Sequence, residues 1–184
     1  MVYIFDTSSF KVLGNYFPKS FPTVWQKIDL IVSEGKLQSV REVLKEVEYG
    51  NNKQFVLDWV DFNKQIFLPP TAQETLFIAE IVSIRNFNDL VSEKATLQGK
   101  PVADPFIIAC AKIKDGCVIT EEALKPNAPK IPTVCQHFSI DCSGFNGARR
   151  LAILKLKLMD KLPINLYVEK AFSGKLITMF SQKF

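Results

Sequence analysis

The sequence contains no long apolar run. None of the apolar stretches in its 184 residues approaches the roughly 18–20 residues that a membrane-spanning helix needs. The first apolar stretch has no basic region before it and reaches an acid at Asp6, which is not the pattern of a signal peptide. Internal repeats and low-complexity segments are also missing. We therefore expect a globular, cytoplasmic protein that does not associate with a membrane.

The sequence has only four cysteines, without C-x-x-C pairs and without the dense spacing of a disulfide framework. We interpret Cys110, Cys117, Cys135 and Cys142 as reduced thiols in or near the core. A zinc site built from Cys135, His137 and Cys142 is an alternative, although its spacing differs from that of a zinc knuckle and the segment is predicted to be a strand. The net charge of +4 permits a polyanionic partner without requiring one.

The composition is that of a globular protein, with 47% hydrophobic and 23% charged residues. Strand-like and helix-like segments alternate along the chain, which favours an α/β fold with a mostly parallel sheet. The character of the sequence changes after the linker-like segment 143–147. We therefore predict a domain over residues 1–142 and a C-terminal extension over 143–184. The apolar side chains of this extension are expected to pack on the domain, on a second copy or on a partner.

Local patterns predict where the elements lie. Capping boxes at Ser39 with Glu42 and at Thr71 with Glu74 mark two helix starts. Helical spacing and Gly or Pro breaks predict helices over 22–35, 39–48, 53–65, 71–85 and 104–115. Short β-rich runs predict strands over 2–5, 36–39, 117–120 and 134–140.

Four acids lie in or next to elements that could bring them to one edge of the predicted sheet. Asp6 ends the first strand, and Glu122 comes two residues after the strand that ends at Thr120. Asp104 opens a helix, and Glu46 lies in the helix that follows the second strand. In a parallel α/β sheet the carboxyl ends of the strands and the N-termini of the following helices share one edge, so we expect the four carboxylates to lie together.

Each acid also has an ordinary structural interpretation. Asp6 suits the cap of a turn, and Asp104 before a proline suits a helix N-cap. Glu122 suits a first helical turn, and Glu46 suits a solvated helix surface. Converging carboxylates, however, repel one another unless a cation neutralises them, and Mg²⁺ or Mn²⁺ prefers oxygen ligands. Such a site activates water and stabilises the charge that develops on a phosphodiester.

The four acids stand in short motifs that resemble those of PIN-domain ribonucleases, the fold of the VapC-type toxins of bacterial toxin–antitoxin pairs. The segment 4–8 (IFDTS) resembles the opening motif, and 42–47 (EVLKEV) resembles the second. The segment 103–111 (ADPFIIACA) resembles the third, and 118–122 (VITEE) resembles the T-x-D strand end. The acids that match the motifs are, in order, Asp6, Glu46, Asp104 and Glu122.

Three further segments, 21–25 (FPTVW), 39–43 (SVREV) and 131–135 (IPTVC), are similar to a subgroup of PIN-like proteins described as a domain of unknown function, DUF4411. The resemblance covers residues 1–142. It implies a PIN-like three-layer α/β/α sandwich with a central, mostly parallel sheet. It also implies a Mg²⁺- or Mn²⁺-dependent endoribonuclease that acts on RNA and has a cognate antitoxin protein. We further expect a homodimer.

The resemblance also implies roles for individual side chains. The four matching acids would be the catalytic residues and metal ligands. Nearby hydroxyls would orient these ligands or bond phosphate, namely Thr7, Ser8 and Thr120. Independently of the resemblance, cations on segments near the predicted edge are candidates to contact RNA phosphates and make RNA binding weaken as salt rises, namely Arg41, Lys45, Lys11, Lys94 and Lys100. Each of them is explained equally well as a solvated surface cation.

Two features depart from the PIN pattern. The fourth acid is Glu122 where many relatives carry Asp, and the segment 143–184 does not match their short ending. A catalytically inactive PIN-like module that binds RNA or a protein is therefore the alternative. A haloacid-dehalogenase-type phosphatase would need a second Asp at the position of Ser8, and a receiver domain would need paired acids earlier in the chain, so both fit less well.

Overall fold

The computed structural model describes residues 1–91 and 102–145 of the chain. These residues belong to one compact unit, Met1–Asn146. A second unit, Gly147–Phe184, lies outside the described residues, as does most of the predicted extension. The domain division at residue 142 therefore stays a prediction.

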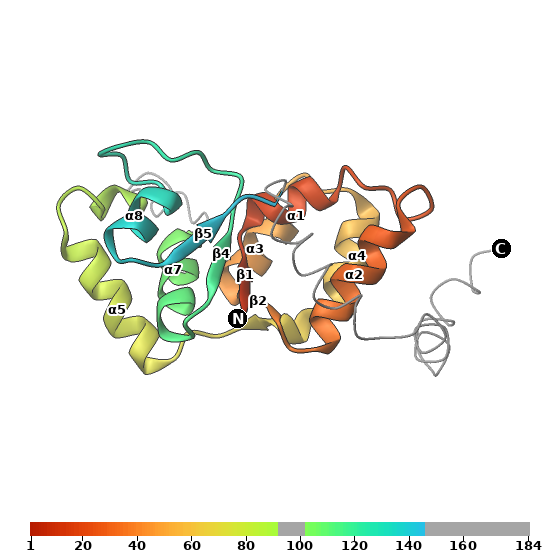
Figure 1. Ribbon diagram of the computed structural model, residues 1–184, viewed down its shortest axis with the longest axis horizontal. Coiled ribbons are helices and arrows are strands. Elements are labelled where there is room, and N and C mark those ends of the chain that lie inside the picture. Colours follow the sequence, from red (N-terminus) through yellow and green to blue (C-terminus); the bar gives the residue numbers. More distant parts are fainter. Residues whose placement is uncertain (92–101, 146–184) are drawn as a thin grey trace. The chain divides into compact units, whose positions relative to one another are not determined.

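The described strands form one five-stranded sheet in which every pair is parallel (Figure 1). Its order is β3-β2-β1-β4-β5, and the strands are β1 (Tyr3–Phe5), β2 (Leu37–Val40), β3 (Phe67–Leu68), β4 (Cys117–Ile119) and β5 (Asp141–Ser143). In the central strand, Tyr3 pairs with Leu37 on one side and with Cys117 on the other. The predicted α/β fold with a mostly parallel sheet is confirmed.

Helices cover both faces of the sheet. The helices are α1 (Thr7–Leu13), α2 (Pro22–Ser33), α3 (Arg41–Tyr49), α4 (Gln54–Phe62), α5 (Ala72–Ser83), α7 (Asp104–Ile113) and α8 (Ile131–His137), with short 3-10 turns at η1 (Lys64–Ile66) and η2 (Asn88–Leu90). Figure 1 shows α5, α7 and α8 on one side and α1, α2 and α4 on the other, and α3 packs against α1 and α4. The result is the expected three-layer α/β/α arrangement.

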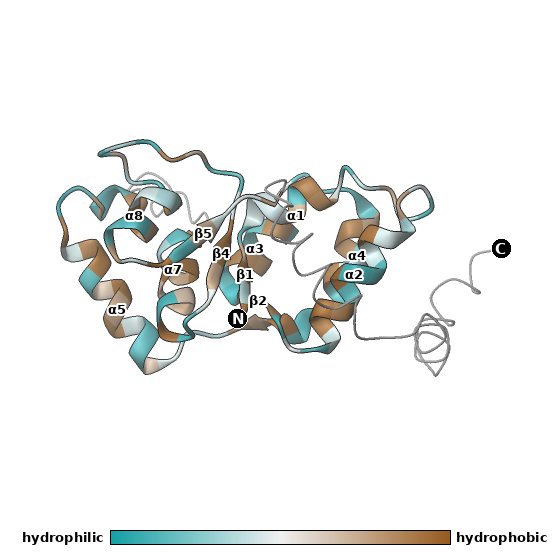
Figure 2. Cartoon of the chain, viewed as in Figure 1, coloured by the Kyte–Doolittle hydropathy of each residue, from teal (hydrophilic) through white to brown (hydrophobic). Residues whose placement is uncertain are grey.

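The core lies where α7 meets the central strands. Ile107 and Ile108 of α7 are fully buried, as are Ile4 of β1 and Val118 of β4. Figure 2 shows the apolar residues of α7 and of the strands in brown. Such continuous apolar runs are typical of parallel strands covered by helices on both faces. Within the described residues, no helix has the length and apolar character required to cross a membrane.

The predicted strand over 134–140 is wrong. This segment belongs largely to helix α8, and the strand that follows it, β5, begins at Asp141. Pro132 stands in the first turn of α8, where its fixed φ and its missing N–H are tolerated. Ile131, Val134 and Cys135 then repeat at helical spacing and are buried. The apolar period is therefore that of a helix.

The two predicted capping boxes have different outcomes. Thr71 and Glu74 form a capping box in which each side chain accepts a hydrogen bond from the other residue's backbone N–H. Ser39 does not cap α3, because its hydroxyl donates instead to the Phe5 carbonyl at 2.7 Å and is fully buried. This hydrogen bond links β2 to β1, so Ser39 serves the sheet and not the helix.

Candidate active site

Asp6 lies at the carboxyl end of the central strand and is the N-cap of α1. Its side chain is 5% exposed. The carboxylate accepts hydrogen bonds from the Thr7 backbone N–H, from the Ser8 hydroxyl at 2.6 Å and from the Thr120 hydroxyl at 2.8 Å. Asp6 is therefore a helix cap, which is the ordinary structural interpretation. Its carboxylate also links the end of β1 to Thr120, which follows β4.

Glu46 joins α3 to the starts of two other helices. One carboxylate oxygen accepts a hydrogen bond from the Thr7 hydroxyl in α1, and the other accepts one from the Ala103 backbone N–H before α7 at 3.0 Å. Burial raises the pKa of Glu46, and the charge of Asp6 raises it further. Glu46 is half-buried, so its interpretation as a solvated helix residue is wrong.

Asp104 is the first residue of α7 and does not cap it. The N-cap is Ala103, and no side chain caps this helix. Burial, followed by the charges of Asp6, Glu122 and Glu46, raises the pKa of Asp104 to about 7. The charges of the three other predicted acids thus all act on this one carboxyl.

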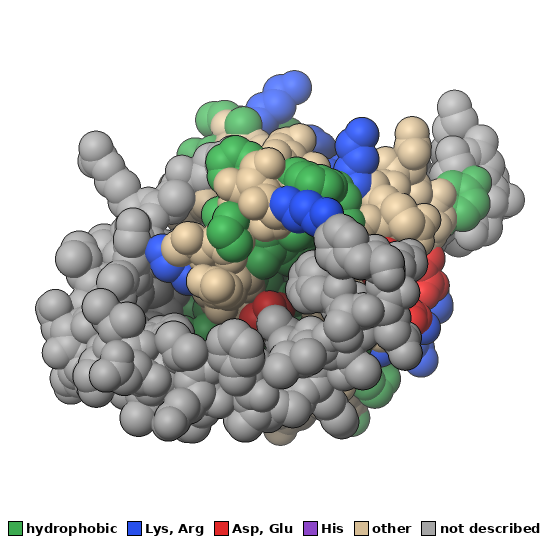
Figure 3. Space-filling model, turned by 90° about the vertical axis from the view of Figure 1, so that its right-hand side faces the viewer, with side chains coloured by type: hydrophobic (Ala, Val, Ile, Leu, Met, Phe, Trp, Pro, Cys, Tyr) green, Lys and Arg blue, Asp and Glu red, His purple; other side chains and the backbone are tan. Residues whose placement is uncertain are grey.

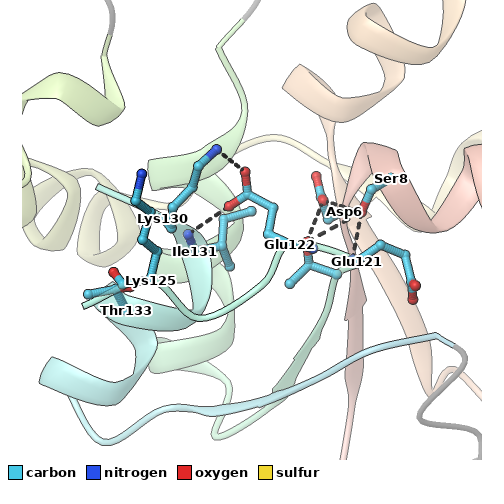
Figure 4. Close-up of polar contacts among 9 residues, drawn as sticks. Asp6, Ser8, Glu121, Glu122, Lys125, Lys130, Ile131 and Thr133 are labelled. Carbon is cyan, nitrogen blue, oxygen red and sulfur yellow. Dashed lines mark hydrogen bonds and ion pairs between the residues drawn. The ribbon is translucent and has the colours of Figure 1, made fainter. Parts of the chain in front are cut away.

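Glu122 lies in the loop between β4 and α8, so its placement in a helical turn is wrong. One carboxylate oxygen pairs with the Lys130 ammonium at 2.7 Å, and the other accepts a hydrogen bond from the Ile131 backbone N–H at 2.9 Å (Figure 4). Because Ile131 is the first residue of α8, Glu122 satisfies an N–H group at the start of that helix.

The acids do not form a ready-made metal cluster. Across residues 1–91 and 102–145, no group of three or more His, Cys, Asp or Glu side chains is placed to hold a metal ion. The zinc alternative is therefore not supported, and His137 packs edge-on against Phe87. Carboxylate oxygens nevertheless suit Mg²⁺ or Mn²⁺, and the raised pKa of Asp104 reports negative charge that a cation would neutralise.

The predicted hydroxyls support the acids. Thr7 donates to Glu46, while Ser8 and Thr120 donate to the same oxygen of Asp6. These neutral donors orient the carboxylates without cancelling their charge. Of these hydroxyl residues, Thr120 lines an open pocket of about 190 Å³, together with Glu121, Glu122, Pro132, Cys142, Ser143 and Gly144.

The predicted cations are spread more widely. Arg41 pairs with Glu42, the other oxygen of which is buried without a hydrogen-bond partner among the described residues. Lys45 is exposed on α3, and the charge of Lys11 lowers the pKa of Glu46. Lys94 and Lys100 lie outside the described residues.

Lys130 is a site residue that the sequence reasoning missed. Its ammonium pairs with Glu122, and the charges of Asp104 and Asp6 also act on it. The available signal was Pro132, because a proline is typical of the first turn of a helix and this helix begins directly after Lys130. A helix start there would have placed Lys130 beside acids at the carboxyl edge of the sheet.

The family model described as "Domain of unknown function (DUF4411)" matches residues 3–147. The chain belongs to this family. The match spans every described helix and strand of this DUF4411 protein, from β1 to β5. No curated protein matches the sequence.

Solved structures include a similar chain. It comes from the crystal structure of VapBC2 from Rickettsia felis bound to a DNA fragment from its promoter. The two chains are 15% identical, with a TM-score of 0.45, over 79% of this DUF4411 protein and 99% of the other chain. A likeness at this level does not identify a function.

Proposed function

We propose that this protein is a Mg²⁺- or Mn²⁺-dependent endoribonuclease of the PIN type. The observation that carries this proposal is the environment of Asp104. A partly buried carboxyl with its pKa raised to about 7 by burial and by the charges of three other acids is unusual for a purely structural group. It is suited to a site that binds a cation.

Asp6, Glu46, Asp104 and Glu122 are the residues that would hold the cation. When bound, the cation supplies an activated water and stabilises charge on the phosphodiester. Hydroxyl groups of the chain would orient these carboxylates for the cation. Thr7 donates a hydrogen bond to Glu46, and Ser8 and Thr120 donate hydrogen bonds to Asp6.

Phosphate contacts are assigned to cations on the helices that begin near this edge. Lys11 in α1 is close enough for its charge to act on Glu46, and Lys45 is exposed in α3. Such contacts are independent of RNA sequence and weaken with added salt. We expect RNA affinity to fall steeply as the salt concentration rises. An affinity that does not change with salt in filter-binding measurements would contradict the assignment of these phosphate contacts.

We further propose that the protein is the toxin of a toxin–antitoxin pair, with an antitoxin and a second copy of the chain as partners. The support is the order of the PIN-like motifs. Exposed aromatic side chains also favour a protein partner, and they include Phe17, Phe21 and Phe62. Figure 3 shows apolar and basic side chains gathered on the side of the molecule that faces right in Figure 1.

Cleavage of RNA by purified full-length protein with Mn²⁺ tests the activity. We expect Asp6→Asn to reduce cleavage by at least about 100-fold. The matched control is Glu48→Gln, which removes an exposed acid from the helix that carries Glu46 and leaves cleavage unchanged.

Metal-dependent cleavage that survives Asp6→Asn would contradict the assignment. Binding of RNA without cleavage by any form would favour the inactive PIN-like module instead. For the toxin assignment, expression of the wild-type protein should arrest bacterial growth and Asp6→Asn should relieve the arrest; equal growth with both forms would count against it.

A further inference from the structure

The loop between β4 and α8 contains an ion pair between two of its own residues, Glu122 and Lys130. Lys130 comes directly before α8, and Ile131 begins it. The Lys130 ammonium and the Ile131 N–H each bind a different oxygen of Glu122, so both carboxylate oxygens are occupied by neighbouring residues (Figure 4). The carboxylate of Glu122 is thus turned toward the start of α8.

The charge of the same ammonium interacts with more than one acid. Hydrogen bonding to Glu122 raises the pKa of Lys130, and the charges of Asp104 and Asp6 raise it further. In return, the charge of Lys130 lowers the pKa of Asp104. One lysine therefore offsets part of the negative charge of three of the four acids.

We propose that Lys130 is the internal counterion of Glu122 and competes with an incoming divalent cation for that carboxylate. This inference rests on the proposed function, because it concerns the same carboxylates. It accounts for the lack of a ready-made cluster among the described residues, since Glu122 is held by Lys130 and by the backbone of α8.

Replacing the Lys130 ammonium by a cation at Glu122 costs the fold little stability. The side chain of Lys130 is 47% exposed, and an ion pair with this exposure contributes little to stability. A lysine ammonium is also a compact charge on a flexible stem, so it moves into water without disturbing the helix. The Ile131 N–H remains available to an oxygen of Glu122 during the exchange.

Equilibrium binding of Mn²⁺ to the full-length protein, followed by electron paramagnetic resonance of free Mn²⁺, tests the inference. We expect Lys130→Gln to bind Mn²⁺ about fivefold more tightly than wild type, because the competing charge is removed. Lys130→Arg keeps the charge and should stay within about twofold of wild type.

Lys125→Gln is the matched control, because it removes the same charge from an exposed residue of the same loop. It should change Mn²⁺ affinity by less than about twofold, since charges at the surface are screened by solvent and salt. In a Glu122→Gln background, Lys130→Gln should no longer tighten binding. This double-mutant cycle separates competition for Glu122 from a general change in net charge.

Equal affinities for Lys130→Gln and Lys125→Gln would overturn the counterion role. If wild type still bound Mn²⁺ in that case and Asp104→Asn lost it, the proposed function would stand without the further inference. Tightening that persists in the Glu122→Gln background would also overturn it. Absence of Mn²⁺ binding in every form would overturn both proposals.

Discussion

Asp6 and Glu122 both follow parallel strands of one sheet, but they are held in opposite ways. Asp6 is buried and accepts hydrogen bonds from two hydroxyls and a backbone N–H, none of which carries charge. Glu122 lies in a loop and is held by a lysine. Neutral donors orient a carboxylate and leave its charge in place, whereas an ammonium orients it and cancels the charge.

The pKa of Asp104 responds to the charges of both regions. Burial raises its pKa most, and the charges of Asp6 and Glu122 raise it further. Lys130 counteracts this rise. The site therefore consists of a region in which negative charge accumulates and a loop in which it is offset.

The largest effect is expected for Asp104→Asn in the absence of metal. With a chelator at pH 8, we expect the free energy of unfolding of the variant to exceed that of wild type by up to roughly 3–4 kcal/mol, because a partly buried charge that is repelled by other acids has been removed. Urea unfolding at pH 8 and at pH 4 measures the difference. A variant less stable than wild type at pH 8 would contradict the described environment of Asp104.

The pH dependence of this effect has a definite sign. The pKa of Asp104 in the folded protein is about 7, above its ordinary value of 3.8, so folding binds the proton more tightly. The contribution to stability is therefore complete below about pH 4 and is lost as pH rises to about 7. The advantage of Asp104→Asn should accordingly shrink as the pH falls through this window.

A smaller effect is expected for Thr120→Val, which keeps the shape of the side chain and removes a donor to Asp6. We expect a loss of about 1–3 kcal/mol, because a buried carboxylate loses a hydrogen bond. Thr133→Val is the control, since within residues 1–91 and 102–145 its hydroxyl donates to the Lys125 carbonyl and not to an acid. If thermal unfolding gave equal losses of stability for both variants, the hydrogen bond to Asp6 would be no more important than the one in the loop, and the distinction between the two regions would be wrong.

The smallest effect is expected for Glu122→Gln. It breaks the ion pair with Lys130 but leaves an amide oxygen that accepts from the Ile131 N–H. Because the pair is exposed, we expect a change of at most about 1 kcal/mol in the free energy of unfolding. A loss larger than that of Thr120→Val would show that the loop, and not the buried acid, controls stability at this edge.

Local sequence signals predicted several elements well. The apolar run before Asp6 became the central strand, and Thr71 with Glu74 became a true capping box. Pro22 opens α2 in the described structure, as its position in the sequence indicated. In these places a single residue or a short run determines the backbone through its own φ preference or its own hydrogen bonds.

Other signals were equally clear in the sequence and were interpreted incorrectly. Ser39 with Glu42 has the same spacing as a capping box, yet Ser39 bonds to the neighbouring strand. The segment 134–140 contains enough apolar residues for a strand, but most of it is helix. Both errors arose because a residue can satisfy its hydrogen bonds or bury its side chain in more than one way, and the neighbours in space decide which.

The sequence by itself determined that four acids stand in motif order in or just after the strands and helices of the sheet, because strand period, turn residues and proline act locally. Only the tertiary structure decided how each acid is held. Thr7 meets Glu46 from 39 positions away, and Lys130 reaches Glu122 across an irregular loop. Such partners have no fixed spacing along the chain, so the charge that remains on each acid emerges only when the elements pack.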